Sequence, residues 1–185
     1  MLRWVLANTA GWSVGLYLGM WSISPVTLCL SGAITGVCLG WAQWWALKTP
    51  QNPPLYEVGG GEPSPITVGR DWIGLTAAGA LVGALPAMGT WVAMLLGWWF
   101  ALALIGAFFG AGVGVAQWYI LGRGMTRAQW WIAANALGGC LCALLTLASI
   151  LRGLPVGLLI GTALYGYITG RALVWLNSHA LKIEG

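Results

Sequence analysis

The residues best suited to chemistry in this chain are side-chain amides in a repeated motif. Residues 36–45 read GVCLGWAQWW and residues 110–119 read GAGVGVAQWY, so a glutamine recurs three residues after the second of two glycines spaced four apart. These glutamines are Gln43 and Gln117. An amide offers N–H donors and a carbonyl acceptor, but neither a strong nucleophile nor a titrating proton. The motif therefore predicts hydrogen bonding rather than catalysis.

Further polar residues precede glycines at a matching spacing. Asn8, Thr76 and Asn135 each lie four residues after a tryptophan and three before a glycine. Because residues three apart share a helix face, we expect these side chains and the two glutamines to form a polar belt that faces other helices. The belt could serve as interhelical hydrogen bonding or as a site for the polar head of a ligand or a metal-centred pigment.

The other reactive residue types form no recognisable catalytic or metal site. Cys140 and Cys142 point to different sides of a helix, and His179 is the only histidine. The sequence contains no nucleophile–base pair, paired carboxylates or phosphate-binding loop, so we expect no enzymatic activity, no catalytic residue and no metal ligand. Arg171 is an unusual cation within a predicted helix, and it would either reach the membrane surface or bind an anionic head group.

The elements that position these residues are predicted to be transmembrane helices. The chain has 185 residues, of which 59% are hydrophobic and 6% charged, whereas typical soluble domains carry about 25% charged residues. Its mean hydropathy is +0.81. No charge occurs between Arg3 and Lys48 or between Asp71 and Arg123, and each run is long enough for two crossings of about 20 residues. The pattern predicts an all-α integral membrane protein with a single membrane domain over residues 1–185.

Turn residues divide the domain into three predicted helical hairpins, at about 3–47, 71–121 and 127–178. Residues 49–70 are rich in proline and glycine, which predicts a polar loop outside the membrane. The first helix lacks the features of a cleaved signal peptide, so we interpret it as part of the mature protein. The six predicted transmembrane helices are 3–22, 27–47, 71–88, 92–121, 127–150 and 154–178.

The basic residues predict the orientation of the protein. With six crossings, seven of the eight basic residues fall on the side of both termini, and Arg152 alone falls on the other. Because basic residues are enriched on the cytoplasmic side, we expect the N- and C-termini in the cytoplasm. The net charge of +4 then reflects this topology and anionic lipid head groups, and we do not expect nucleic acid as a partner.

Small residues recur every four positions in the second helix of each hairpin, which indicates an internal threefold repeat. Glycines at this spacing let two helix backbones approach closely in lipid, so they predict helix packing. The third hairpin differs in having Leu173 at the position of the glutamines and Arg171 directly after its last glycine, so we expect any functional site there. The repeated small residues are Gly32, Gly36 and Gly40, then Gly106, Gly110 and Gly114, and then Thr162, Gly166 and Gly170.

The chain contains 14 tryptophans, which are expected mainly at the ends of the helices. An aromatic belt at the two membrane surfaces explains this placement. The alternative is that some of them stack on a carotenoid, a chlorophyll, a quinone or an acyl chain. The tryptophans predicted at the cytoplasmic ends are Trp4, Trp44, Trp45, Trp72, Trp130 and Trp131, and those nearer the outer ends are Trp21, Trp91, Trp98 and Trp99.

The repeated G-x3-G-x2-Q-W element, with W-x3-N-x2-G in the preceding helix of the first hairpin, resembles uncharacterised multipass membrane proteins of cyanobacteria and other photosynthetic bacteria. The resemblance covers most of the membrane region. It implies a plasma or thylakoid membrane and a photosynthetic complex as a partner, but it implies no activity.

Together these features favour a non-enzymatic interaction protein, an accessory or assembly subunit that docks on a membrane-protein partner or a second copy of itself. Its glycine faces and tryptophan-rich rim would be the docking surfaces, and membrane lipids would surround it. The alternative is a binding protein or carrier for an apolar ligand. A small-solute channel or transporter is less favoured because the predicted spans contain no acid or histidine. The sequence requires no cofactor; chlorophyll, carotenoid, quinone and lipid are the candidate ligands.

Overall fold

The computed structural model describes residues 1–19, 25–48, 65–85, 97–121, 127–153 and 156–180, and these residues are almost entirely helical. Three of the six described helices, α5, α6 and α7, are long and apolar enough to cross a membrane. The all-helical class is therefore confirmed, and three helices have the length and composition of membrane-spanning segments. The helices are α1 (Leu2–Gly19), α2 (Pro25–Leu47), α3 (Pro65–Ala84), α5 (Trp98–Leu121), α6 (Gln129–Ile150) and α7 (Gly157–Ala180).

Helices α3 and α5 begin several residues away from their predicted starts, and the other starts lie within three residues of the prediction. Helix α3 begins at Pro65, so the last residues of the predicted polar loop belong to a helix. Proline suits this position because its fixed φ matches a helix and its missing N–H would have no partner in the first turn. Helix α5 begins at Trp98, directly after Gly97, whose φ of 117° is incompatible with a helix; residues 92–96, which the prediction included, lie outside the described part of the structure.

The turn between α6 and α7 requires glycine. Gly153 has a φ of 67°, which glycine adopts without steric cost. At the start of α7, the Gly157 N–H donates a hydrogen bond to Ser149 Oγ at 2.8 Å. A Cβ on Gly157 would lie 2.0 Å from the Ser149 Cβ, so the two helices could not come this close with a larger residue.

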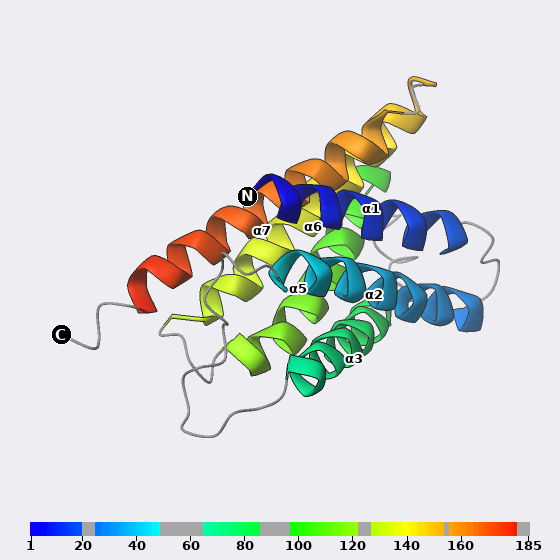
Figure 1. Cartoon of the computed structure of the whole chain (residues 1–185). Coiled ribbons are helices and arrows are strands. Elements are labelled where there is room, and N and C mark those ends of the chain that lie inside the picture. Colours follow the sequence, from blue (N-terminus) through cyan, green and yellow to red (C-terminus); the bar gives the residue numbers. More distant parts are fainter. Residues whose placement is uncertain (20–24, 49–64, 86–96, 122–126, 154–155, 181–185) are drawn as a thin grey trace.

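The six helices form a closed ring in which each helix packs against its two neighbours. The order around the ring follows the chain, and the ring closes where α7 packs against α1. Figure 1 shows α1 and α7 side by side although they come from opposite ends of the sequence. The chain therefore forms three hairpins, α1–α2, α3–α5 and α6–α7, that surround a common axis.

The ladder glycines join each hairpin to the next. A Cβ on Gly36 would lie 2.6 Å from the Cα of Ala77 in α3, and a Cβ on Gly110 would lie 2.1 Å from the backbone oxygen of Asn135 in α6. Gly166 meets α1 in the same way and so closes the ring. The remaining ladder glycines contact the same neighbours: Gly32 and Gly40 face α3, Gly106 and Gly114 face α6, and Gly170 faces α1.

A second set of glycines joins the two helices within each hairpin. These are the glycines that follow the repeated polar residues in the first helices. Gly11 faces Leu39 in α2, Gly79 faces Gly112 in α5, and Gly138 faces Tyr165 in α7. The contacts recur at the positions that the sequence repeat aligns, so both small-residue faces of the hairpins are buried in the ring.

The interior of the ring contains two clusters of buried side chains. We call the end of the ring that holds the first cluster the basal end and the opposite end the distal end. The basal cluster comprises Trp4, Ala7, Ala42, Ala46, Trp72, Leu121, Ala128, Trp131 and Leu176, with contributions from all six helices. The second cluster, in the middle of the ring, comprises Trp12, Leu39, Ala80, Val113, Cys142 and Tyr165.

The basal cluster corrects the prediction of an aromatic belt for three of the tryptophans. Trp4, Trp72 and Trp131 are 5%, 2% and 0% exposed and lie inside the ring. They open the first helices on the same face as the polar residues four positions later, and this face points to the axis. Trp45 and Trp130 lie on the outer surface as predicted, and Trp44 is half-buried. Trp99 is exposed, whereas Trp21, Trp91 and the Trp98 side chain lie outside the described part of the structure.

Candidate functional site

The polar residues of the repeat meet near the axis of the ring, next to the basal cluster. Asn8, Gln43, Thr76, Gln117 and Asn135 are all fully buried. They come from α1, α2, α3, α5 and α6, and ring closure brings them together. Their hydrogen bonds follow one pattern through the first two hairpins, and other residue types continue it in the third.

In the first hairpin, one glutamine joins its own hairpin to the next. The Gln43 Nε2 donates to Asn8 Oδ1 at 2.8 Å, which links α2 to α1. The Gln43 Oε1 accepts a hydrogen bond from the Trp72 indole Nε1 at 3.3 Å, which links α2 to α3. The Gln43 amide therefore donates a hydrogen bond within its own hairpin and accepts one from the next hairpin.

The second hairpin repeats this arrangement. The Gln117 Nε2 donates to Thr76 Oγ1 at 2.9 Å, and its Oε1 accepts from the Trp131 Nε1 at 3.1 Å. The Gln117 Nε2 also donates to Gln43 Oε1 at 2.6 Å, so the two glutamines contact each other directly. Each glutamine thus satisfies the indole donor of the next hairpin.

In the third hairpin, two residues together make the contacts that a single glutamine makes in each of the other hairpins. The Tyr165 hydroxyl donates to Asn135 Oδ1 within the hairpin. The Thr169 Oγ1 accepts from the Trp4 Nε1 at 3.0 Å and so joins α7 to α1. Neither residue was predicted from the sequence. The available signal was their position one residue before each of the ladder glycines Gly166 and Gly170, which places them next to the packing face.

The polar residues of the first helices also bond to their own backbone. Each donates to the carbonyl of the leading tryptophan four residues earlier, and this fixes the side-chain rotamer that meets the network. The donor–acceptor distances are 2.8 Å for Asn8 Nδ2 to Trp4 O, 2.7 Å for Thr76 Oγ1 to Trp72 O, and 2.9 Å for Asn135 Nδ2 to Trp131 O.

The resulting network contains only neutral groups, and every buried nitrogen and oxygen of its side chains has a partner. The buried side-chain atoms without one, among the described residues, are Arg3 Nε, Trp12 Nε1 and Ser13 Oγ. A buried polar group without a partner is costly, so a network that satisfies itself needs no bound ligand or water. This geometry favours interhelical hydrogen bonding over ligand binding for the polar belt.

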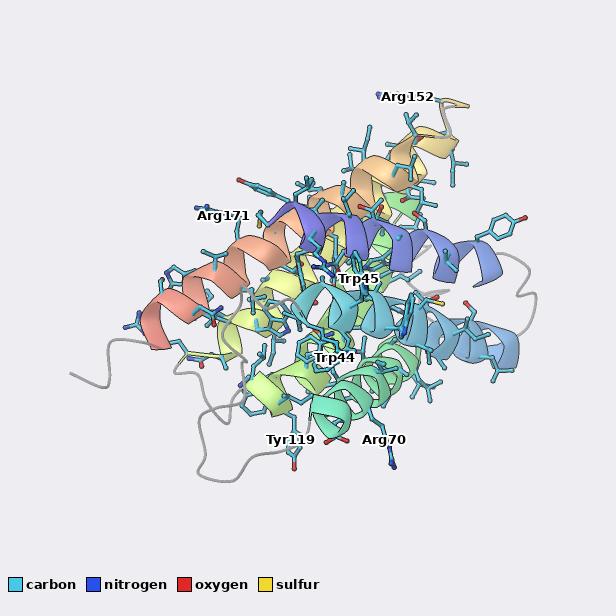
Figure 2. The ribbon with its side chains drawn as sticks, in the orientation of Figure 1. Trp44, Trp45, Arg70, Tyr119, Arg152 and Arg171 are labelled. Carbon is cyan, nitrogen blue, oxygen red and sulfur yellow. The ribbon has the colours of Figure 1, made fainter. Side chains whose placement is uncertain are left out.

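Arg171, predicted as a member of the belt, lies apart from this network. It is exposed, and Figure 2 shows it projecting from the outer side of α7. Leu173, which occupies the glutamine position of the third hairpin, packs against the basal cluster. Tyr165 and Thr169 supply the polar contacts that Leu173 cannot make. Thr162 is also buried, but its hydroxyl bonds within its own helix.

The distal half of the ring contains an apolar cavity of about 350 Å³. Its wall includes Gly32, Gly83, Gly106 and Gly139, which contribute no side-chain volume. The threonine hydroxyls in the wall are already bonded to carbonyls of their own helices. Other lining residues are Trp12, Ser31, Thr35, Ile105, Phe109 and Thr146.

Three aromatic rings separate the cavity from the network. The Trp12 ring centroid lies 4.9 Å from that of Phe109 and 5.2 Å from that of Tyr165. Trp12 lines the cavity, and its buried indole ring packs against Tyr165, a member of the network. The cavity is therefore an apolar space that aromatic rings close on the side of the network.

Cysteines and acids add no further site in the described ranges. Cys38, Cys140 and Cys142 carry free thiols, and the described residues include no group of three histidine, cysteine or acidic side chains that could hold a metal ion. The His179 side chain lies outside these ranges.

Comparison with known proteins adds no assignment to this geometry. No protein-family model matches the chain, and no curated protein and no solved structure shows significant similarity to it. The candidate site is therefore defined by its own contacts: a self-satisfied polar network at the basal side and an apolar cavity at the distal side.

Proposed function

We propose that this chain is an integral membrane protein that crosses the bilayer with all six described helices. α1, α2 and α3 pack in one ring with the three apolar helices, so they would cross at the same depth. Their outward side chains are apolar as well, including Leu6, Val14, Ile34, Val37 and Val82, each 43–58% exposed. A ring of helices that buries its glycine faces and exposes apolar side chains is suited to contact with lipid.

The charges support an orientation with the basal end in the cytoplasm. Arg3, Lys48, Arg70 and Arg127 lie at the ends of helices on the basal side. Arg152 follows the distal end of α6, and Figure 2 shows it at the far tip of the molecule from Arg70. By the positive-inside rule, both termini would be cytoplasmic.

In the membrane, the protein would hold an apolar ligand in the distal cavity without carrying out chemistry. The cavity volume of about 350 Å³ supports this proposal, because small-molecule sites are typically mostly apolar spaces of roughly 300–1,000 Å³ with a few polar groups. The predominantly apolar lining would favour an apolar molecule, such as a quinone or an acyl lipid.

A non-enzymatic accessory subunit is the second candidate. Its support is the aromatic outer surface, where Trp41, Trp45, Trp99, Trp118 and Trp130 are 41–63% exposed. The glycine faces that were expected to dock a partner are buried between helices, so this function would depend on the aromatic surface. A solute channel along the axis has less support because the basal cluster and the network occupy the centre of the ring.

Isolation in mild detergent tests the ligand-binding function. The wild-type protein should retain an apolar compound in a stoichiometric amount, detected by mass spectrometry and absorption spectroscopy. Ser31→Phe, which adds bulk to the cavity wall, should lose most of it. Leu30→Phe is the matched control because Leu30 is adjacent in α2 but 57% exposed on the outer surface. Thr146→Leu tests the opposite wall if Ser31→Phe does not fold.

The outcomes separate the two candidate functions. Equal retention by the wild type and the folded cavity variants would contradict a ligand in this cavity. A stoichiometric membrane protein in place of a small molecule would favour the accessory subunit. If alkaline carbonate extracted the chain from membranes, the proposed six-span placement itself would be wrong.

A further inference from the structure

A second, chemically different hollow lies on the outside of the ring at the basal end, between α2 and α3. Its volume is about 580 Å³. One wall is a stripe of α2 residues spaced three and four apart, and the other wall is the second turn of α3 and the turn after it. We call it the α2–α3 groove; it is lined by Trp41, Trp44, Lys48, Gly69, Arg70, Ile73 and Gly74.

The groove is cationic at one end. Lys48 and Arg70 both line it, and both side chains are exposed. Figure 2 shows Arg70 projecting away from the bundle beneath α3. Asp71 is the only acid in the part of the chain that the structure describes, and it does not line the groove. The charged end therefore presents two cations to an anion at the predicted cytoplasmic surface.

The other end of the groove is apolar and open. Trp41 lies seven residues before Lys48 on α2, or about 10 Å along the helix axis. On α3, a Cβ added to Gly74 would meet no atom within 4 Å, so space continues along the helix beside Ile73. Charge at the membrane surface and open apolar space deeper in the membrane match the two parts of a phospholipid.

Between its two ends, the groove has a floor formed by the Trp44 ring, and this ring can lie there because residue 69 is glycine. A Cβ on Gly69 would lie 2.4 Å from the Trp44 Cε2 and 2.6 Å from its Nε1, so the indole packs directly on the backbone of α3. Trp44 is half-buried in this position. A larger residue at position 69 would displace the ring and change the groove.

The next hairpin junction, between α5 and α6, lacks these features although the repeat aligns it with the groove. When Trp72 is aligned with Trp131, the positions of Gly69, Arg70 and Gly74 are occupied by Ala128, Gln129 and Ala133. The first and third replacements add a methyl group, and the second removes the cation. The groove is therefore a local feature of the α2–α3 junction and not a general consequence of the ring.

We propose that the α2–α3 groove binds one anionic glycerophospholipid of the cytoplasmic leaflet, with its phosphate at Lys48 and Arg70 and an acyl chain along Trp41, Ile73 and Gly74. Basic side chains near a membrane surface attract anionic lipids, and the aromatic residue supplies an apolar surface for the chain. The proposal rests on the membrane placement given above but not on a ligand in the distal cavity.

Native mass spectrometry of the full chain tests the proposal. The protein is released from nanodiscs of phosphatidylcholine that contain a small fraction of phosphatidylglycerol, and bound phosphatidylglycerol is counted. The wild type should retain one molecule. The double variant Lys48→Gln with Arg70→Gln should reduce retention at least about tenfold. The matched control, Arg127→Gln with Arg171→Gln, removes the same charge from exposed basal-side positions outside the groove and should retain the lipid.

A second pair of variants tests the apolar end without changing charge. Gly74→Leu should fill the open space and reduce retention several-fold, whereas Ala133→Leu at the aligned position of the α5–α6 junction should have no effect. Both positions are exposed on the outer surface, so neither variant should prevent folding.

Three results would overturn the proposal. Equal loss of lipid in the groove variants and their controls would show general electrostatic attraction. Retention of phosphatidylglycerol by Gly74→Leu, together with displacement of the lipid by inorganic phosphate, would show a site for a free anion. Carbonate extraction of the wild-type chain would contradict the membrane placement on which the proposal rests. Loss of the cavity ligand in Ser31→Phe with normal lipid retention would not be such a result, because it would show that the lipid site is independent of the cavity.

Discussion

The basal and distal halves of the ring are built from the same three hairpins but fill their interiors in different ways. The basal half buries tryptophans and polar side chains whose hydrogen-bonding groups satisfy one another. The distal half is lined by glycines together with apolar side chains of mixed size and leaves a cavity of about 350 Å³. The same repeat therefore forms a hydrogen-bonded interior in one half of the ring and leaves an apolar cavity in the other.

The two halves differ in which interactions hold their helices together. In lipid, helix association depends on close packing and interhelical hydrogen bonds, because lipid tails are as apolar as leucine. The basal half uses both, whereas the distal half relies mainly on close packing, with the bond from the Gly157 N–H to Ser149 Oγ as an interhelical hydrogen bond. Substitutions in the two halves should therefore have unequal effects on the free energy of unfolding.

Gln117→Leu should have the largest effect. It leaves the Trp131 indole N–H without its acceptor and removes the bonds to Gln43 and Thr76, so the free energy of unfolding should fall by about 2–4 kcal/mol. Titration with SDS in mixed micelles measures this change. Val115→Leu, two residues away and 49% exposed, should be close to neutral.

A substitution in the distal half provides the comparison for Gln117→Leu. Thr146 lines the cavity, and its hydroxyl donates to the Cys142 carbonyl of its own helix at 2.8 Å. Thr146→Val should therefore change the free energy of unfolding by less than about 0.5 kcal/mol. Equal effects of Gln117→Leu and Thr146→Val would mean that the network contributes nothing beyond packing.

Tyr165→Phe should have an intermediate effect. It removes one hydroxyl and leaves the buried Asn135 Oδ1 without that donor, so we expect a loss of about 1–2 kcal/mol. Tyr167→Phe is the matched control because Tyr167 is two residues away and 53% exposed. If both variants unfold like the wild type in SDS titrations, Tyr165 does not act as the third-hairpin equivalent of a glutamine.

Thr169→Val should have the smallest effect of the three network changes. It keeps the shape of the side chain but removes the acceptor for the Trp4 Nε1, which should cost about 0.6 kcal/mol, the average for such bonds in membranes. Thr169→Ser keeps the hydroxyl and should restore most of the loss. The near-ultraviolet circular dichroism should also change in Thr169→Val, because Trp4 packs edge-on against Trp131 with a centroid distance of 6.1 Å.

Periodicity in the sequence was sufficient to predict several local features. The apolar composition predicted helices long enough to cross a membrane, and three of the described helices meet that criterion. The spacing of Gln43 and Gln117 from the glycines placed each amide on the packing face of its own helix, and both are buried. These features follow from residues within one helix, where sequence spacing determines direction.

Contacts between distant helices could not be predicted in the same way. Spacing placed Trp4, Trp72 and Trp131 at helix ends but could not show whether their face met lipid or the axis. It also assigned Arg171 to the polar belt, whereas the structure places this residue on the outer side of α7. Tyr165 and Thr169 were missed because their residue types differ from glutamine although their positions serve the same contacts.

By itself, the sequence determined the helical class, the packing faces and the repeated polar positions, because each depends on residues a few positions apart. Only the tertiary structure decided that α7 meets α1, that the ring closes around a polar network, and that a cavity remains beside it. A glycine face can pack on any helix that presents a small surface. Which helix it meets depends on the simultaneous fit of all the hairpins, and no single stretch of the chain contains that information.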